Sequence, residues 1–264
     1  MKKVFLSLAA VLVLGGAVWS HEFFVMTDNK TFKPGDKVPL YVLSTHYFTV
    51  GEELEGLRYN KVWVRQGGRR TELGLKENPD RLWYETEFNL QGDAPVIVEG
   101  NRVGGYTTRF TDGSSFEGTP ADARKANPGK TLARAGFLEK FSKTYINPKP
   151  GDTTFSGPLG FTLEIVPLEN PANYKTGGNA RFRVLYRGQP LSGAEVFAVY
   201  DYYDYKTMNA YEQKGNTDRN GEITFRISNP GIWILRVRDS RNSAVPDVTV
   251  ENVDSIVVFT VPGQ

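Results

Sequence analysis

Cysteine is absent from the sequence, and histidine occurs only twice. Without cysteine there can be no disulfide framework, no thiolate metal cluster, no cysteine nucleophile and no lipid-modified cysteine behind a leader peptide. The two histidines are His21 and His46. Any site that needs an imidazole base or an imidazole ligand must therefore use one of these two residues.

An excess of charge of either sign is also missing. The sequence has 32 basic and 30 acidic residues, and a mature chain without Lys2 and Lys3 would have 30 of each. This balance gives no electrostatic reason to expect nucleic acid as a partner. No run beyond residue 20 is apolar enough to cross a bilayer, so we expect no transmembrane segment in the mature chain.

Common catalytic motifs are missing as well. The sequence has no G-x-S-x-G elbow for a serine nucleophile, no Walker loop for phosphates and no glycine-rich turn between a strand and a helix for a dinucleotide. We therefore expect a protein that is not an enzyme.

Residues 1–20 have the pattern of a secretion signal. A basic start is followed by the apolar run Val4–Leu14 and then by small residues. Cleavage after Ser20 fits the small-residue rule and would make His21 the new N-terminus. Cleavage after Ala17 also fits and would leave His21 three residues inside the chain. We expect an exported, soluble, periplasmic protein.

Short alternating segments separated by turns dominate the rest of the chain. The 27 glycines and 15 prolines supply many turns, which favours an all-β fold. We predict two immunoglobulin-like β-sandwich domains, an N-terminal one over residues 21–112 and a C-terminal one over residues 158–264. The second resembles prealbumin-like and adhesin-type modules.

The segment 113–157 interrupts this rhythm and is predicted to be a connector with a short helix. Residues 121–125 could form one helical turn or two before Pro128 and Gly129 end it. Residues 130–145 have apolar side chains at helical spacing, which predicts a further helix packed on a sandwich.

The stretch from His21 to His46 reads as two strands around a turn. Phe23–Thr27 and Lys37–Phe48 are the strands, and Lys33-Pro34-Gly35-Asp36 is the turn. If the strands pair antiparallel about this turn, His21 and His46 face each other at the open end of the ribbon.

Two imidazoles and a free α-amine at one place favour metal binding. An N-terminal His21 would offer its amine and Nδ1 as a chelate ring, and His46 would add a third nitrogen, a set that suits Cu(II) or Ni(II). Glu22, Glu52, Asp28 or a nearby tyrosine could complete the shell. The alternatives are two ordinary imidazoles, or a copper oxidase for which the sequence offers no substrate groove.

Tyrosines crowd the segment Tyr200–Tyr211. Alternation would place Tyr203 and Tyr205 on one face of a strand, with Tyr211 across a hairpin. Such a face is typical of a sheet surface or interface. It could also bind a protein or a glycan, which is the alternative function for a structural or adhesive β-sandwich module.

Several motifs occur in a characteristic order along the chain. They are His21-Glu22-Phe23-Phe24, F-x-P-G-D at 32–36, T-H-Y-F at 45–48, P-L-G-F-T-L-E-I-V-P-L at 158–168, V-L-Y-R-G-Q-P-L-S-G-A at 184–194, T-D-R-N-G at 217–221 and G-I-W-I-L-R-V at 231–237. Together they resemble a bacterial exported family of unknown function. That family was formerly described as NikM-like, or as the periplasmic component of a cobalt/nickel uptake system.

The resemblance implies a periplasmic protein of two β-sandwiches that binds a divalent transition metal, nickel, cobalt or copper. It also implies a role accessory to metal uptake, with a membrane transport complex as the possible partner. His21 and His46 are the positions that match the family pattern. This chain has Arg238-Asp239 where family members often have a further histidine, so the resemblance does not supply a third imidazole ligand.

Overall fold

The computed structural model describes residues 21–46, 48, 50–54 and 56–263. The predicted secretion signal, residues 1–20, lies outside the described residues, so its cleavage stays a prediction. The strands are β1 (Glu22–Met26), β2 (Lys37–Thr45), β3 (Asn60–Gln66), β4 (Arg69–Leu73), β5 (Lys76–Asn78), β6 (Trp83–Asn89), β7 (Val96–Phe110), β8 (Ser115–Glu117), β9 (Leu132–Ile146), β10 (Leu163–Pro167), β11 (Asn179–Tyr186), β12 (Gln189–Pro190), β13 (Glu195–Tyr200), β14 (Gln213–Asn216), β15 (Glu222–Arg226), β16 (Gly231–Asn242) and β17 (Val250–Val261).

The helical content is small. Helix α1 (Pro120–Ala126) lies within the predicted connector, and three 3₁₀ turns cover Leu57–Tyr59, Thr154–Ser156 and Pro171–Asn173. Thr119 caps α1 by accepting a hydrogen bond from the backbone N–H of Asp122. Within the described residues, no helix combines the length and apolar character needed to span a bilayer. The prediction of an all-β fold with a short connector helix is confirmed.

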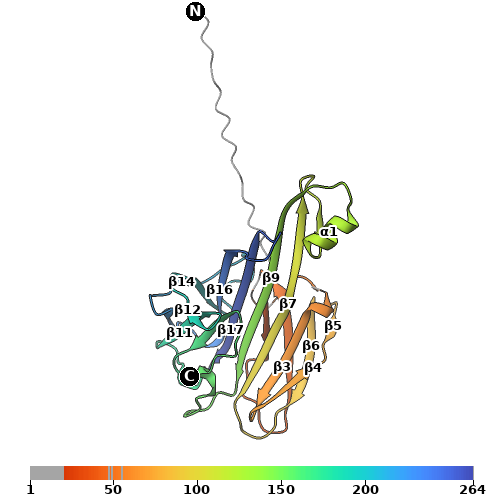
Figure 1. Ribbon diagram of the computed structural model, residues 1–264. Helices are drawn as coiled ribbons and strands as arrows, with labels where there is room; N and C mark the ends of the chain where they lie inside the picture. Colours follow the sequence, from red (N-terminus) through yellow and green to blue (C-terminus); the bar gives the residue numbers. More distant parts are fainter. Residues whose placement is uncertain (1–20, 47, 49, 55, 264) are drawn as a thin grey trace, which may run out of the picture.

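Three sheets form the immunoglobulin-like β-sandwich architecture. The largest has the order β14-β13-β16-β17-β9-β7-β3-β4, with β8 attached to β7. A second sheet has the order β1-β2-β6-β5, and a third joins β10, β11, β12 and β15. Figure 1 shows the long strands β7 and β9 through the middle of the molecule, with N-terminal strands on one side and C-terminal strands on the other.

The helix predicted over residues 130–145 is wrong, because β9 occupies this segment. The strand pairs antiparallel with β7 and parallel with β17, which joins the N-terminal and C-terminal parts in one continuous sheet. A central strand that is covered on both faces lacks the alternation of apolar and polar residues that marks a half-exposed strand. The division of the chain at residues 112 and 158 stays a prediction.

Side chains of β9 alternate between the two faces of the large sheet. Lys140 points to the face that β1 covers, where its Nζ donates a hydrogen bond to the backbone oxygen of His21. Lys143 points to the opposite face and pairs with Glu164 of β10. The second sheet therefore covers one face and the third sheet covers the other.

Strand β1 is packed tightly on the large sheet. Its backbone at Val25 bonds two β9 side chains: the N–H donates to Ser142 Oγ at 3.1 Å, and the carbonyl accepts from Thr144. Beneath it lies Gly100 of β7, where an added Cβ would stand 2.7 Å from Val25 Cγ2 and 3.2 Å from Phe23. The glycine gives β1 the space to lie on the sheet.

Replacing Gly100 with alanine is expected to lower the free energy of unfolding by about 1–3 kcal/mol, because the added methyl group overpacks the contact with β1. Urea denaturation measures this change. Gly105→Ala is the control in the same strand, since nothing lies within 4 Å of its added Cβ. We expect the control to change stability by less than about 0.5 kcal/mol. Equal losses of stability at both positions would contradict the explanation that Gly100 provides space for β1.

Candidate metal centre

The register of β1 and β2 brings the two histidines together. Glu22 faces Thr45 and Phe23 faces Ser44, as the sequence predicts for strands paired about the turn at residues 33–36. His21 immediately precedes β1 and His46 immediately follows β2. The two rings meet at this end of the ribbon, with centroids 4.4 Å apart and planes inclined by 46°.

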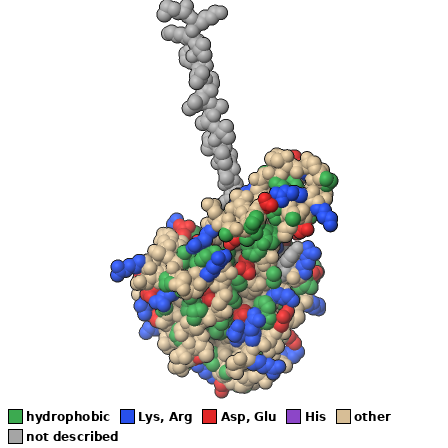
Figure 2. Space-filling view, in the orientation of Figure 1, with side chains coloured by type: hydrophobic (Ala, Val, Ile, Leu, Met, Phe, Trp, Pro, Cys, Tyr) green, Lys and Arg blue, Asp and Glu red, His purple; other side chains and the backbone are tan. Residues whose placement is uncertain are grey.

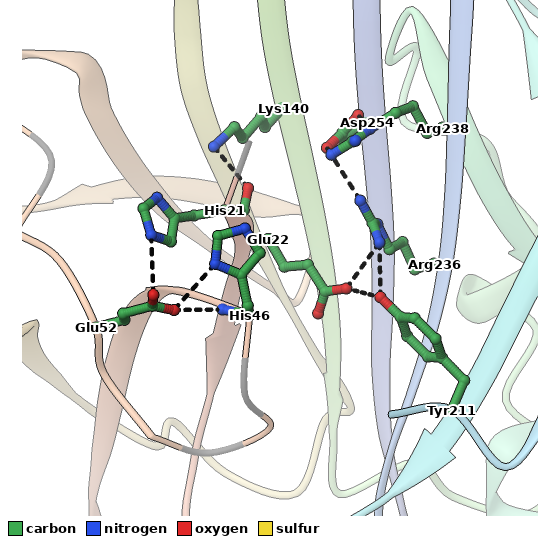
Figure 3. A network of polar contacts seen from close by, with 9 residues as sticks. All are labelled: His21, Glu22, His46, Glu52, Lys140, Tyr211, Arg236, Arg238 and Asp254. Carbon is green, nitrogen blue, oxygen red and sulfur yellow. Dashed lines mark hydrogen bonds and ion pairs between the residues drawn. The ribbon is translucent and has the colours of Figure 1, made fainter. Parts of the chain in front are cut away.

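The Glu52 carboxylate lies between the two imidazoles (Figure 3). Its Oε1 is 3.5 Å from His21 Nε2, and its Oε2 is 3.1 Å from His46 Nδ1. The same Oε2 accepts a hydrogen bond from the backbone N–H of His46 at 2.8 Å. His46 is buried, and within the described part of the chain its Nε2 has no hydrogen-bond partner.

The loop after β2 places two carboxylates beside the rings. The backbone N–H groups of Glu52 and Glu53 donate to the same acceptor, the carbonyl oxygen of Ser44, at 3.2 and 3.3 Å. This reversal sets Glu52 between the histidines and Glu53 on the outer side of His21, where its Oε2 is 2.9 Å from Nδ1. Glu53 was not predicted as a site residue.

The local hydrogen bonds keep Glu52 ionised. Burial acts to raise the pKa of this carboxyl group, but the hydrogen bonds from the backbone N–H and ring of His46 outweigh it. The pKa of Glu52 is therefore below its ordinary value. A negative charge between two imidazoles is suited to receive a cation.

Two long-range contacts hold the backbone of the histidines. Lys140 Nζ donates to the carbonyl oxygen of His21 at 2.7 Å, and the backbone N–H of Asn209 donates to the carbonyl oxygen of His46 at 2.9 Å. Asn209 belongs to the segment between β13 and β14, residues 201–212, which we call the tyrosine loop. The site therefore lies where parts from both halves of the chain meet.

Glu22, predicted as a possible ligand, faces away from the imidazoles toward the C-terminal strands (Figure 3). Its Oε1 accepts a hydrogen bond from Tyr211 and forms an ion pair with Arg236 at 3.0 Å. Arg236 also approaches Asp254, which binds Arg238 through two hydrogen bonds of 2.6 Å. Burial raises the pKa of Glu22, while Arg236 opposes that shift. Glu22 therefore contacts Tyr211 and Arg236 and does not face the two imidazole rings.

The spacing of the three donors fits a metal ion. His21, His46 and Glu52 each offer a ligand atom within 4.8 Å of the others. Neighbouring donors on one ion with bonds of about 2.0–2.2 Å stand about 3–3.5 Å apart. The 3.5 Å and 3.1 Å contacts of Glu52 with the two imidazole nitrogens are of this length, and a bound ion would replace the proton that His46 Nδ1 donates to Glu52. Two imidazoles and a carboxylate also form a donor set typical of divalent transition metals.

The predicted tyrosine face has a different geometry from the one expected. Strand β13 ends at Tyr200, so Tyr203 and Tyr205 lie in the tyrosine loop and not on a strand. Both are exposed, whereas Tyr211 is half-buried and donates its hydroxyl hydrogen bond to Glu22. Tyr202, which was not predicted, is the most exposed of them at 76%.

The sequence of residues 18–241 matches the family described as "domain of unknown function (DUF4198)". The match covers most of the chain, which therefore belongs to this family. The finding agrees with the predicted resemblance to a family of unknown function. The description of that family as NikM-like, and its link to cobalt or nickel uptake, stay predictions. No curated protein matches the sequence significantly.

Several solved structures have some likeness to the chain. The D0–D1 domain of intimin is 12% identical, with a TM-score of 0.21, and the match covers 92% of this chain and 99% of that one. The ectodomain of mouse nectin-like molecule 4 is 10% identical, with a TM-score of 0.20 and coverages of 93% and 66%. A protein of Bacteroides uniformis to which carbohydrate binding has been ascribed is 14% identical, with a TM-score of 0.23 and coverages of 90% and 97%. Likenesses of this degree do not support an inference about the ligand of this chain.

Proposed function

We propose that this member of the DUF4198 family is an exported, non-enzymatic protein that binds one divalent transition metal ion through His21, His46 and Glu52. The ion is nickel, cobalt or copper, and the protein acts in the periplasm as an accessory to metal uptake. A membrane transport complex is the partner that this role requires. The observation that carries the proposal is the convergence of two imidazoles on one ionised carboxylate.

The chemistry of the donors supports this assignment. Both histidines of the sequence lie at one place, with their ring centroids 4.4 Å apart. Glu52 is about one-third exposed, so an ion from solvent can reach the carboxylate without unfolding the strands. The backbones of both histidines are held by contacts from distant strands and loops, which limits the rearrangement that binding would demand.

Metal titration at several pH values tests the proposal. We expect one ion per chain near neutral pH and weaker binding below about pH 6, because a metal ion binds only neutral imidazole, and imidazole in model peptides gains a proton at about pH 6.5. The pKa of Glu52 is lowered, so its carboxylate stays ionised through this range. Calorimetry or competition with a coloured chelator measures the affinity. Binding that is absent, or that does not change between pH 5 and 8, would contradict the proposal.

A second candidate function is favoured by the exposed rings of the tyrosine loop. Tyr202 and Tyr205 line a hollow of about 460 Å³ at the far end of β1, together with polar side chains of Asp28 and Asn29. Exposed aromatic faces beside carboxylate and amide groups suit a glycan or a protein segment. Loss of glycan binding in Tyr202→Ala, in a protein without metal affinity, would favour this alternative.

A further inference from the structure

The two nitrogens of His21 face different carboxylates. Nε2 faces Glu52 at 3.5 Å, on the side shared with His46. Nδ1 faces Glu53 at 2.9 Å, on the outer side. The ring therefore lies between two acidic residues that are adjacent in the chain, and only Glu52 belongs to the group of three converging donors.

A carboxylate at one imidazole nitrogen determines which nitrogen can bind a metal. An ionised carboxylate accepts a hydrogen bond and therefore favours the tautomer whose proton is on the nitrogen beside it. Glu53, at 2.9 Å from Nδ1, is well within hydrogen-bond distance, whereas Glu52 is 3.5 Å from Nε2, so the proton of His21 is on Nδ1 and the lone pair is on Nε2. A chelate through the terminal amine needs the opposite arrangement, because the amine and Nδ1 together would close that ring.

Backbone contacts at His21, Glu52 and Glu53 also favour a proton on Nδ1 and a lone pair on Nε2 of His21. The hydrogen bond from Lys140 Nζ holds the carbonyl oxygen of His21, and the hydrogen bonds to Ser44 hold Glu52 and Glu53 in register beside it. Glu53 is 54% exposed, so its carboxylate stays hydrated and contributes little to folding stability. Its substitution should leave the fold intact.

From this geometry we infer that His21 binds the metal through Nε2, and that Glu53 is the positioning residue that selects this nitrogen. The terminal amine is then not required, so residues that remain ahead of His21 do not abolish binding. This inference rests on the proposed metal-binding function. It gives the ion two imidazoles and one carboxylate, the set found in zinc sites that leave a coordination position open.

The test compares three forms of the exported protein. They are the wild type, Glu53→Gln, and a variant with two asparagines inserted between Ser20 and His21, which do not fit the small-residue rule for cleavage. The mature N-terminus of each is determined by mass spectrometry, and affinity is measured with Ni²⁺, Co²⁺ and Cu²⁺, and with Zn²⁺ as a diamagnetic probe for NMR. We expect Glu53→Gln to weaken binding by about 10-fold or more, as is usual when a carboxylate behind a ligand is lost. We expect the insertion to change affinity by less than about 3-fold.

The control and a spectroscopic readout separate positioning from a structural effect. Glu87→Gln removes an exposed carboxylate that pairs with Lys37 at the opposite end of β2 from His46, and it should change affinity by less than about 2-fold. Heteronuclear NMR of the Zn²⁺-bound protein should show His21 with its proton on Nδ1. A chelate through the amine would instead give loss of binding on insertion and no effect of Glu53→Gln, which overturns the inference. A wild type that binds no metal ends both the inference and the proposed function.

Discussion

Replacing His46 with alanine is expected to lower the affinity for nickel, cobalt or copper by about 100-fold or more. The loss of a carboxylate behind a ligand already weakens metal binding by about 10–100-fold, and the loss of a ligand itself should exceed that. His46 also orients Glu52, which accepts hydrogen bonds from its backbone and its ring. Competition with a chelator of known affinity measures the change.

His46 is buried, so removing its side chain can also impair folding. A second variant, Glu52→Gln, tests metal binding independently of that effect. The amide oxygen can still accept the hydrogen bond from the backbone of His46, while the negative charge is lost. We expect a loss of about 10-fold or more in affinity with an unchanged thermal midpoint. Wild-type affinity in both variants would show that the three side chains do not hold the ion.

Replacing Lys143 with methionine is expected to lower the free energy of unfolding by about 3–5 kcal/mol. Lys143 and Glu164 are both fully buried and lie 2.8 Å apart, so removing the lysine leaves an unpaired carboxylate in the core. Glu164 also accepts hydrogen bonds from the backbone N–H groups of residues 159–161, which prevents it from turning toward solvent. Urea denaturation measures the loss.

A double variant distinguishes a buried charge from a simple loss of packing. In Lys143→Met/Glu164→Gln neither charge of this pair is left, and the amide oxygen can still accept from the N–H groups of Gly160 and Phe161, so we expect part of the stability to return. Lys61→Met, which breaks an exposed pair with Glu72, is the control and should change stability by less than about 0.5 kcal/mol. A double variant as unstable as Lys143→Met would refute this explanation.

The meeting of the two histidines could be predicted because local residues determine it. The turn at residues 33–36 closes with a hydrogen bond from Asp36 N–H to the Lys33 carbonyl, and Gly35 adopts a φ of +89°. The position of this turn and the alternation of apolar residues along β2 together determine the register of β2 with β1. The approach of the rings to each other follows from these short-range features.

The structure of β9 could not be predicted in the same way. Its lysines are buried on opposite faces, and their partners are the carbonyl of His21, 119 residues away, and Glu164 of the next strand, β10. In a one-dimensional pattern these lysines look like exposed positions, which gives the apolar residues around them a helical spacing. Contacts with strands distant in the chain decided the conformation, and sequence periodicity does not contain them.

The sequence also failed to predict the positions of two loop residues, Glu53 and Tyr211. Glu53 follows Glu52 directly, but only the paired hydrogen bonds to Ser44 determine that its carboxylate reaches the outer nitrogen of His21. Tyr211 was expected at a partner surface and instead binds Glu22 behind the histidines. Such placements depend on how a loop folds back, for which the sequence offers no periodic signal.

The parallel pairing of β9 with β17 has a consequence for how cargo could leave the protein. Receptors that close on their ligand like a clamshell need a flexible joint between two lobes. Here the lobes are joined by neighbouring strands over Gly136–Thr144 and Val250–Val258, so no such joint exists along that seam. If the proposed function holds, release of the ion would therefore not proceed by parting of the two lobes along this seam.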